Sequence, residues 1–270
     1  MIQNKKTLRV LSLGAGVQST TLALMINQGE LPMVNCAIFA DTKGEPKYVY
    51  DHLNWLKNKL KFPIYIVTNG NLLKDNLKLL QGKHTSKGAL IPYHMLYENK
   101  KSIGFRQCTT NYKIRPIQKK VRELLGLKKY QRAKNMEVKM IIGISYDELN
   151  RMTINKTKYI ENLYPFVEKK ITRQQCIKWL KNNNYPIPNR SACWFCPYHT
   201  SKEWIEMKNN HTEELNKAVK FEKIINRENK VLKGKLFLNG LHKNLEDLKP
   251  KNNNQLEFSF KDECEGMCGV

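Results

Sequence analysis

One stretch, Leu11-Ser12-Leu13-Gly14-Ala15-Gly16-Val17-Gln18-Ser19-Thr20, decides the fold of this chain. A hydrophobic run precedes it and an apolar-periodic segment, residues 21–26, follows it, which indicates a strand, a tight turn and a helix. Gly14 and Gly16 permit close backbone approach, and Ser19 or Thr20 is expected to cap a helix whose free N–H groups suit an anion. The stretch therefore predicts a phosphate-binding turn, although glycines in this place also serve as a plain turn. Val17-Gln18-Ser19 stands where a Walker motif has Gly-Lys-Ser/Thr, so an ordinary P-loop NTPase is disfavoured.

Strand and helix patterns alternate along the first two thirds of the chain. Strands are expected at 8–13, 34–40, 64–68 and 139–144, and helices at 19–28, 46–60, 71–80, 117–125 and 172–181. This order predicts an α/β fold with a doubly wound, mainly parallel sheet, which binds ligands beyond the carboxyl ends of its strands. Residues 81–104 lack periodicity and are expected to form an irregular loop over the site. We expect a nucleotide-binding α/β domain at 1–165, a helical region at 166–249 and a flexible cysteine-containing tail at 250–270.

The chain is strongly basic. It has 47 Lys and Arg against 24 Asp and Glu, a formal net charge of +23. A solvated surface is one reading, but basic residues recur along the whole chain, which favours a polyanionic partner and in particular a nucleic acid, RNA or DNA. No apolar run approaches the roughly 20 residues of a membrane span, and residues 1–6 lack the apolar segment of a secretory signal, so we expect a cytoplasmic protein without a membrane partner.

Polar residues follow the expected strands at the edge where ligands bind. Asp41 comes directly after the second strand, where it can orient a ribose or a metal, or merely stabilise a turn. Asp147 and Arg151 follow the fourth strand and are candidate catalytic residues. Cys108 lies between clustered bases and ahead of a helix, both of which lower the pKa of a thiol.

The spacing of the cysteines predicts a metal site. In Cys193-Trp194-Phe195-Cys196 a short turn directs two sulfurs toward one centre. With Cys108 and a tail cysteine, Cys264 or Cys268, they make a set of four that suits a [4Fe–4S] cluster; zinc, or no metal, remains an alternative. Cys36 and Cys176 fall within a strand and on an apolar helical face, and are expected in the core.

The motifs, in this order, resemble the phosphoadenosine phosphosulfate (PAPS) reductase-like family of the adenine nucleotide α-hydrolase, or N-type ATP pyrophosphatase (PP-loop), superfamily. Residues 14–19 resemble the phosphate loop Ser-Gly-Gly-x-Asp-Ser, and Asp41-Thr42-Lys43-Gly44 resembles a post-strand Asp-Thr-Gly. Residues 107–116 resemble Cys-Cys-x-x-x-Lys-x-x-Pro. Two positions depart from the family: Gln18 replaces an acidic residue and Gln107 replaces the first cysteine of the pair.

The resemblance implies an enzyme of sulfur chemistry that uses ATP or another adenine nucleotide, with Mg²⁺ as a further candidate. The nucleotide would contact Ser12, Gly14, Ala15, Gly16, Gln18, Ser19, Asp41 and Lys113. In the family a tail thiol attacks the sulfonucleotide. We expect Cys268 to be that thiol and Cys264 a metal ligand; the alternative is that Cys264 is the catalytic thiol, since Glu263-Cys264 is the better match to the family's segment. With the basic charge, our first expectation is a sulfur transferase or oxidoreductase that acts on or modifies a nucleic acid, with a sulfur- or electron-donor protein as a further partner. The alternatives are a PAPS (sulfonucleotide) reductase and a non-catalytic nucleotide- or nucleic-acid-binding module.

Overall fold

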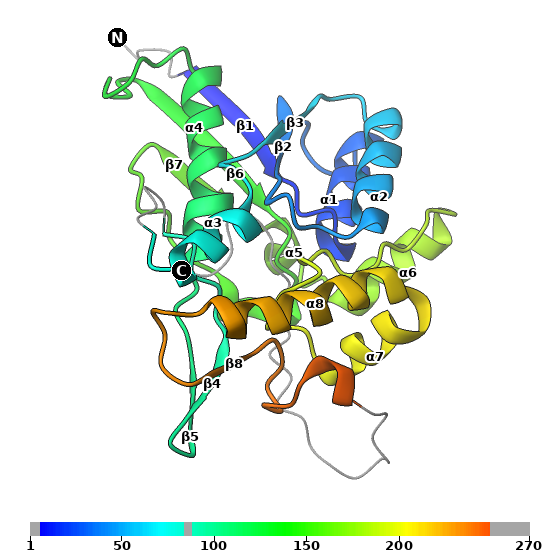
Figure 1. Ribbon diagram of the computed structural model, residues 1–270. Coiled ribbons are helices and arrows are strands. Elements are labelled where there is room, and N and C mark those ends of the chain that lie inside the picture. The colour runs from blue at the N-terminus through cyan, green and yellow to red at the C-terminus, as the bar shows by residue number, and fades with distance from the viewer. Residues whose placement is uncertain (1–5, 84–87, 249–270) are drawn as a thin grey trace.

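The computed structural model describes residues 6–83 and 88–248. Its centre is a parallel sheet in the order β3-β2-β1-β6-β7, made of β1 (Lys6–Ser12), β2 (Cys36–Ala40), β3 (Ile64–Val67), β6 (Met136–Ile142) and β7 (Ile160–Leu163). The chain runs outward from β1 through β2 and β3 and then returns to the other side of β1 (Figure 1). This confirms the doubly wound α/β fold and places the reversal of strand order between β1 and β6, where such sheets bind ligands.

Helices cover both faces of this sheet because successive strand residues point to opposite sides. Leu11 belongs to a core with α1 (Val17–Gln28), α2 (Lys47–Lys59) and α6 (Arg173–Asn182), whereas Val10 belongs to a core with α4 (Arg115–Leu124). Figure 1 shows α1 and α2 on one side of the sheet and α4 on the other. Cys36 and Cys176 are buried in these cores, as expected. Because α6 shares a core with α1, residues after 165 pack directly on the sheet; the division at 165 stays a prediction.

A second, antiparallel sheet in the order β5-β4-β8 corrects the expectation of an irregular loop at 81–104. It consists of β4 (His94–Tyr97), β5 (Lys100–Ile103) and β8 (Lys235–Phe237). Glu98 and Asn99 have φ of +47° and +60°, the backbone that a two-residue hairpin turn needs. All four residues of β5 are exposed, so the strand carries no hydrophobic alternation by which the sequence reveals it.

The remaining elements lie around the two sheets. They are α3 (Leu72–Leu80), a π-helical segment (Thr109–Ile114), α5 (Pro165–Glu168), α7 (Ser201–Asn210), α8 (Thr212–Glu228) and 3₁₀ turns at Tyr146–Arg151 and Leu245–Asp247. Apolar side chains of α3, α7 and α8 pack with Tyr93 and Phe195 in a third core. Among the described residues, no helix is both long enough and apolar enough to cross a membrane.

Candidate functional site at the carboxyl edge of the sheet

The turn after β1 has the geometry of an anion site. Gly16 is the N-cap of α1, so the helix begins at Val17, two residues before the expected start. Ser19 lies inside the helix, where its Oγ donates to the Gly16 carbonyl oxygen at 3.3 Å, and neither a side-chain cap nor an acidic residue occupies the first turn. Ala15 has φ of +61°, a region that a residue with a Cβ seldom adopts. The first N–H groups of α1 are thereby presented without a capping side chain.

Two buried polar atoms mark the same turn. Ser12 Oγ and Gln18 Oε1 are buried and have no hydrogen-bond partner among the described residues. Buried polar groups are rarely left unpaired in folded proteins, because an unmade hydrogen bond costs about 1–3 kcal/mol. Both atoms are therefore available to a polar ligand bound at this turn.

Gln18 joins the β1 turn to the loop after β6. Its Nε2 donates to Glu148 Oε2 at 2.9 Å, and Arg151 Nη1 lies 2.8 Å from Glu148 Oε1. All three side chains are buried. Gln18 thus brings a buried carboxylate, that of Glu148, to the turn after β1, and sequence reasoning did not single out Glu148.

The two candidate catalytic residues after β6 lie differently. Arg151 is paired with Glu148 inside the site, whereas Asp147 is exposed and its Oδ1 accepts a hydrogen bond from Arg173 N at the start of α6, at 2.9 Å. The 3₁₀ turn at Tyr146–Arg151 separates neighbouring side chains in this way. No pattern in the sequence distinguishes Glu148 from Asp147.

Asp41 is buried in the loop after β2 and is held by its own loop. Its Oδ1 accepts hydrogen bonds from Lys43 N at 2.7 Å and from the Tyr50 hydroxyl at 2.8 Å, and its Oδ2 pairs with Lys43 Nζ at 2.7 Å. The contact with Lys43 N is the turn-stabilising bond that the sequence left open as an alternative. The Lys43 side chain is half exposed, so this ion pair is weak and easily exchanged for a ligand.

The three candidate metal ligands in the described part of the chain line one cavity. Cys108, Cys193 and Cys196 meet there with Lys113, and the other lining residues are Thr42, Leu72, Ile91, Pro92, Arg106, Phe195 and Tyr198. The cavity holds about 20 Å³, room for about one water molecule. Thr42 Oγ1 lies 3.1 Å from Cys193 Sγ, so the residue next to Asp41 contacts the cysteine cavity.

A buried carboxylate controls the charge at this cavity. Glu45 Oε1 lies 3.6 Å from Lys113 Nζ and 3.8 Å from Cys193 Sγ, while Glu45 Oε2 is buried without a hydrogen-bond partner among the described residues. Burial, and then the charge of Glu45, raise the pKa of the Cys193 thiol, and Lys113 opposes them. Cys193 is therefore a neutral thiol at pH 7 in the absence of a metal. Glu45 was also missed from the sequence, although it ends the Asp41-to-Glu45 stretch.

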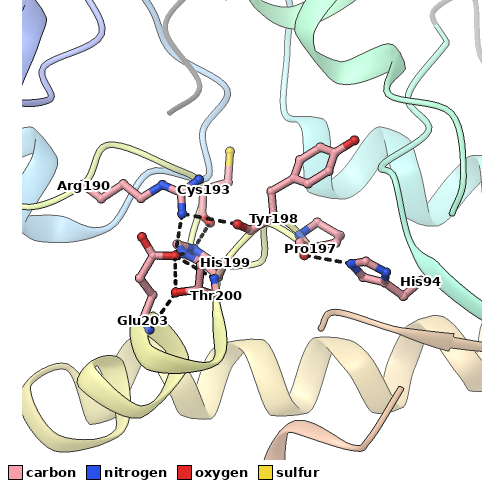
Figure 2. Close-up of polar contacts among 8 residues, drawn as sticks. All are labelled: His94, Arg190, Cys193, Pro197, Tyr198, His199, Thr200 and Glu203. Atoms are coloured by element: carbon pink, nitrogen blue, oxygen red, sulfur yellow. Dashed lines mark hydrogen bonds and ion pairs between the residues drawn. The ribbon is translucent and has the colours of Figure 1, made fainter. Parts of the chain in front are cut away.

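Side chains from three parts of the chain fix the Cys-x-x-Cys turn and the residues after it: Arg190 before the turn, His199 and Glu203 after it, and His94 from β4 (Figure 2). Arg190 Nη1 donates to the Tyr198 carbonyl oxygen at 3.2 Å and pairs with Glu203. His199 Nε2 lies 3.0 Å from the Cys193 carbonyl oxygen, and His94 Nε2 lies 3.1 Å from that of Pro197.

These contacts also set the ionisation of Glu203. Burial by itself raises the pKa of the Glu203 carboxyl, but its contact with His199 and the charge of Arg190 outweigh burial and hold this pKa well below its ordinary value. The carboxylate stays charged and keeps Arg190 and the turn in place. The Cys193 sulfur points away from this group in Figure 2.

The metal site itself stays a prediction. Within residues 6–83 and 88–248, no three His, Cys, Asp or Glu side chains are arranged to hold a metal ion. The five cysteines in the described part of the chain form no disulfide with one another. Cys264 and Cys268, expected to supply the fourth ligand and the reactive thiol, lie outside the described residues.

Comparison with known proteins finds similarity at the level of structure alone. No family model and no curated protein sequence matches the chain. Among solved structures, the chain is similar to the phosphoadenylyl-sulfate (PAPS) reductase of Candida auris, determined in a phosphate complex. The TM-score is 0.44 and the identity 12%, over 72% of this chain and 83% of the reductase. The likeness is one of fold, and the roles of single residues do not follow from it.

Proposed function

We propose that this protein is an adenine-nucleotide-dependent enzyme of sulfur chemistry, and that a sulfonucleotide such as PAPS is its substrate. One observation carries the proposal. In the loop after β2, Thr42 contacts Cys193, and Asp41 is the residue next to Thr42. The cysteine cavity therefore adjoins the edge of the sheet where the turn after β1 lies. The unpaired Ser12 Oγ and Gln18 Oε1 support a nucleotide at the turn after β1.

The reaction that fits these groups is a two-electron reduction. A thiolate attacks the sulfonate sulfur, the S–O bond to the nucleotide phosphate breaks, and the nucleotide leaves with the electron pair. A second thiol then attacks the cysteine sulfur of the resulting S-sulfonate. The bond between this sulfur and the sulfonate breaks, sulfite leaves, and a disulfide remains. An external dithiol protein must reduce that disulfide. Lys113 and Arg106, which line the cavity, supply positive charge for the sulfonate, and we assign the attacking thiolate to Cys268 of the tail.

A cysteine-ligated metal belongs to the same proposal. Cys108, Cys193 and Cys196 with Cys264 would hold a [4Fe–4S] cluster, with zinc as the alternative, and the thiolates would gain the charge stabilisation that burial denies to Cys193 alone. Protein purified without oxygen is expected to be brown and to carry about four irons per chain. Cys193→Ser should lose the iron, and Cys176→Ser, a buried cysteine in another core, is the matched control. If the protein contains zinc and no iron after anaerobic reconstitution, the site holds a structural zinc ion and not a cluster.

The decisive experiment measures sulfite from labelled PAPS with a reduced dithiol protein. Sulfite release that depends on Cys268 supports the proposal. Gly16→Val should also abolish it, because a side chain there blocks the approach of a phosphate to the backbone, and isothermal titration should show the loss of nucleotide binding. Protein that binds neither ATP nor PAPS, with its metal loaded, would refute the assignment.

A nucleic acid as the sulfur acceptor is the second candidate, favoured by the net charge of +23. In this case the nucleotide activates an oxygen or carbon centre of the nucleic acid, and a donor protein supplies the sulfur. Mass spectrometry of nucleosides from cells with and without the gene separates the two reactions. A thiolated nucleoside that disappears with the gene supports the second, and an unchanged nucleoside profile together with sulfite release supports the first.

A further inference from the structure

A band of positive charge runs along one helix and the loop that follows it. Between residues 115 and 134 the chain has eight Lys or Arg and a single acid, Glu123. Glu123 is paired with Lys120, and Arg122 is bonded to backbone carbonyls. The six other cations, which we call the α4 ridge, form no ion pair with a carboxylate of the described residues: Arg115, Lys119, Lys128, Lys129, Arg132 and Lys134.

The first part of the ridge is aligned by helix geometry. Spacings of four and three residues put Arg115 and Lys119 on one side of α4, together with Arg122, which is not part of the ridge. The opposite side of the helix buries Ile117 and Val121 against the sheet. The helix begins where the π-helical segment ends, and the first ridge residue, Arg115, follows two residues after Lys113 of the cysteine cavity.

The second part of the ridge is the loop that follows α4, and hydrogen bonds hold the shape of this loop. The Arg122 guanidinium donates to the carbonyl oxygens of Lys128 and Gln131, at 2.8 and 2.9 Å, and Gln131 Oε1 accepts from Lys128 N at 2.9 Å. Figure 1 shows α4 leading from the lower part of the molecule toward the end where β1 and β6 begin. The loop is thus a fixed continuation of the helix.

This loop holds one aromatic side chain out in solvent. Tyr130 is 86% exposed and has φ of +65°, a left-handed backbone that is strained for a bulky residue. Lys129 Nζ lies 5.0 Å from the centre of its ring. Strain that the surrounding hydrogen bonds maintain is typical of functional positions. An exposed ring among unpaired cations is the arrangement that stacks a base while the cations contact phosphates.

We propose that the α4 ridge binds a single-stranded nucleic acid, with Tyr130 stacking on a base and the cations following the backbone toward the candidate site. The ridge has no apolar side chain other than Tyr130 with which to enter a lipid surface, which disfavours an anionic membrane. The inference goes beyond the sulfonucleotide reaction, which does not require it, and it names the surface that the nucleic acid of the second candidate function would use.

The test measures fluorescence anisotropy of a labelled single-stranded oligonucleotide, as RNA and as DNA, at several salt concentrations. The double variant Lys119→Gln/Lys129→Gln is compared with Lys178→Gln/Lys181→Gln on α6, which removes the same charge from another exposed surface. The ridge variant should bind more weakly and lower the slope of log K against log salt by about 1.4, because each phosphate contact with a single strand contributes about 0.7, and the α6 variant should change little. If the two double variants lose the same affinity, the net charge of the protein and not the ridge determines binding, and the proposal is overturned.

Tyr130→Gly provides an independent test. Glycine adopts positive φ without strain, so the variant should fold at least as stably as the parent protein. Affinity for the single strand should fall about 5-fold or more, the effect of one lost stacking contact, and affinity for a duplex should not change. An unchanged single-strand affinity, or ridge-dependent binding to anionic vesicles but not to oligonucleotides, would contradict the proposal. Gly16→Val should retain oligonucleotide binding, which separates this inference from nucleotide binding.

Discussion

Replacing Gly44 by alanine tests the contact on which the candidate site depends. Gly44 lies in the loop after β2, and its carbonyl oxygen accepts a hydrogen bond from Trp194 N at 3.0 Å, which joins that loop to the Cys-x-x-Cys turn. A Cβ at Gly44 would lie 2.5 Å from Phe195 Cε1 and 2.8 Å from Cζ. Carbon atoms in contact need about 3.5–4.0 Å, so either the ring or the loop must move by about 1 Å.

The ring has little freedom to move. Phe195 is 1% exposed and packs edge-on against Trp194 and Phe221, with ring centres at 4.8 and 5.4 Å. Overpacking of this kind costs about 1–3 kcal/mol. For a domain of this size it should lower the thermal midpoint by about 2–10 °C. The displacement should also open the cavity beside Cys193, so its thiol should react faster with a small alkylating reagent.

The assay is thermal and urea unfolding, with mass spectrometry of alkylated cysteines. Phe195→Leu is the matched variant, because a smaller side chain leaves room for a Cβ at position 44. The free energy of unfolding of the double variant Gly44→Ala/Phe195→Leu should exceed the value expected from adding the two single effects by about 1 kcal/mol or more. If Gly44→Ala is as stable as the parent protein, or if the two effects simply add, the loop and the turn are not packed as the structure has them.

Two further predictions concern ionisable groups. Burial lowers the pKa of His52, whose Nε2 lies 2.9 Å from Thr20 Oγ1, to about 4. The unfolded chain then binds a proton below pH 6.5 that the folded chain does not, so stability is lost as pH falls from about 6.5 to about 4, by up to about 3 kcal/mol. Urea titrations should show His52→Gln removing this loss, and an equally steep loss in the variant would contradict it. In metal-free protein, Glu45→Gln should shift the pH profile of Cys193 alkylation to lower pH and Lys113→Met to higher pH, since they remove opposite charges; shifts in the same direction would show that packing, not charge, controls the thiol.

The fold followed from the sequence where burial and glycine placement left a pattern. The run of buried strands and helices from Leu8 onward, with glycines at its first turn, specified the parallel sheet and therefore the edge at which sheets of this kind bind ligands. Elements without such a pattern were missed. Strand β5 is entirely exposed, and β7 is a four-residue strand at the edge of the sheet, so neither has a hydrophobic period of its own.

The candidate site divides in the same way. The glycine turn after β1 and the spacing of the cysteines were visible in the sequence, because they depend on residue type and on short local separations. Which groups meet across the chain was decided by tertiary structure. Thr42 and Glu45 reach Cys193 from about 150 residues away, and Glu148 reaches Gln18 from 130. The sequence names the donors and acceptors, but the packing of strands and loops brings them together and decides which buried carboxylate stands beside a thiol.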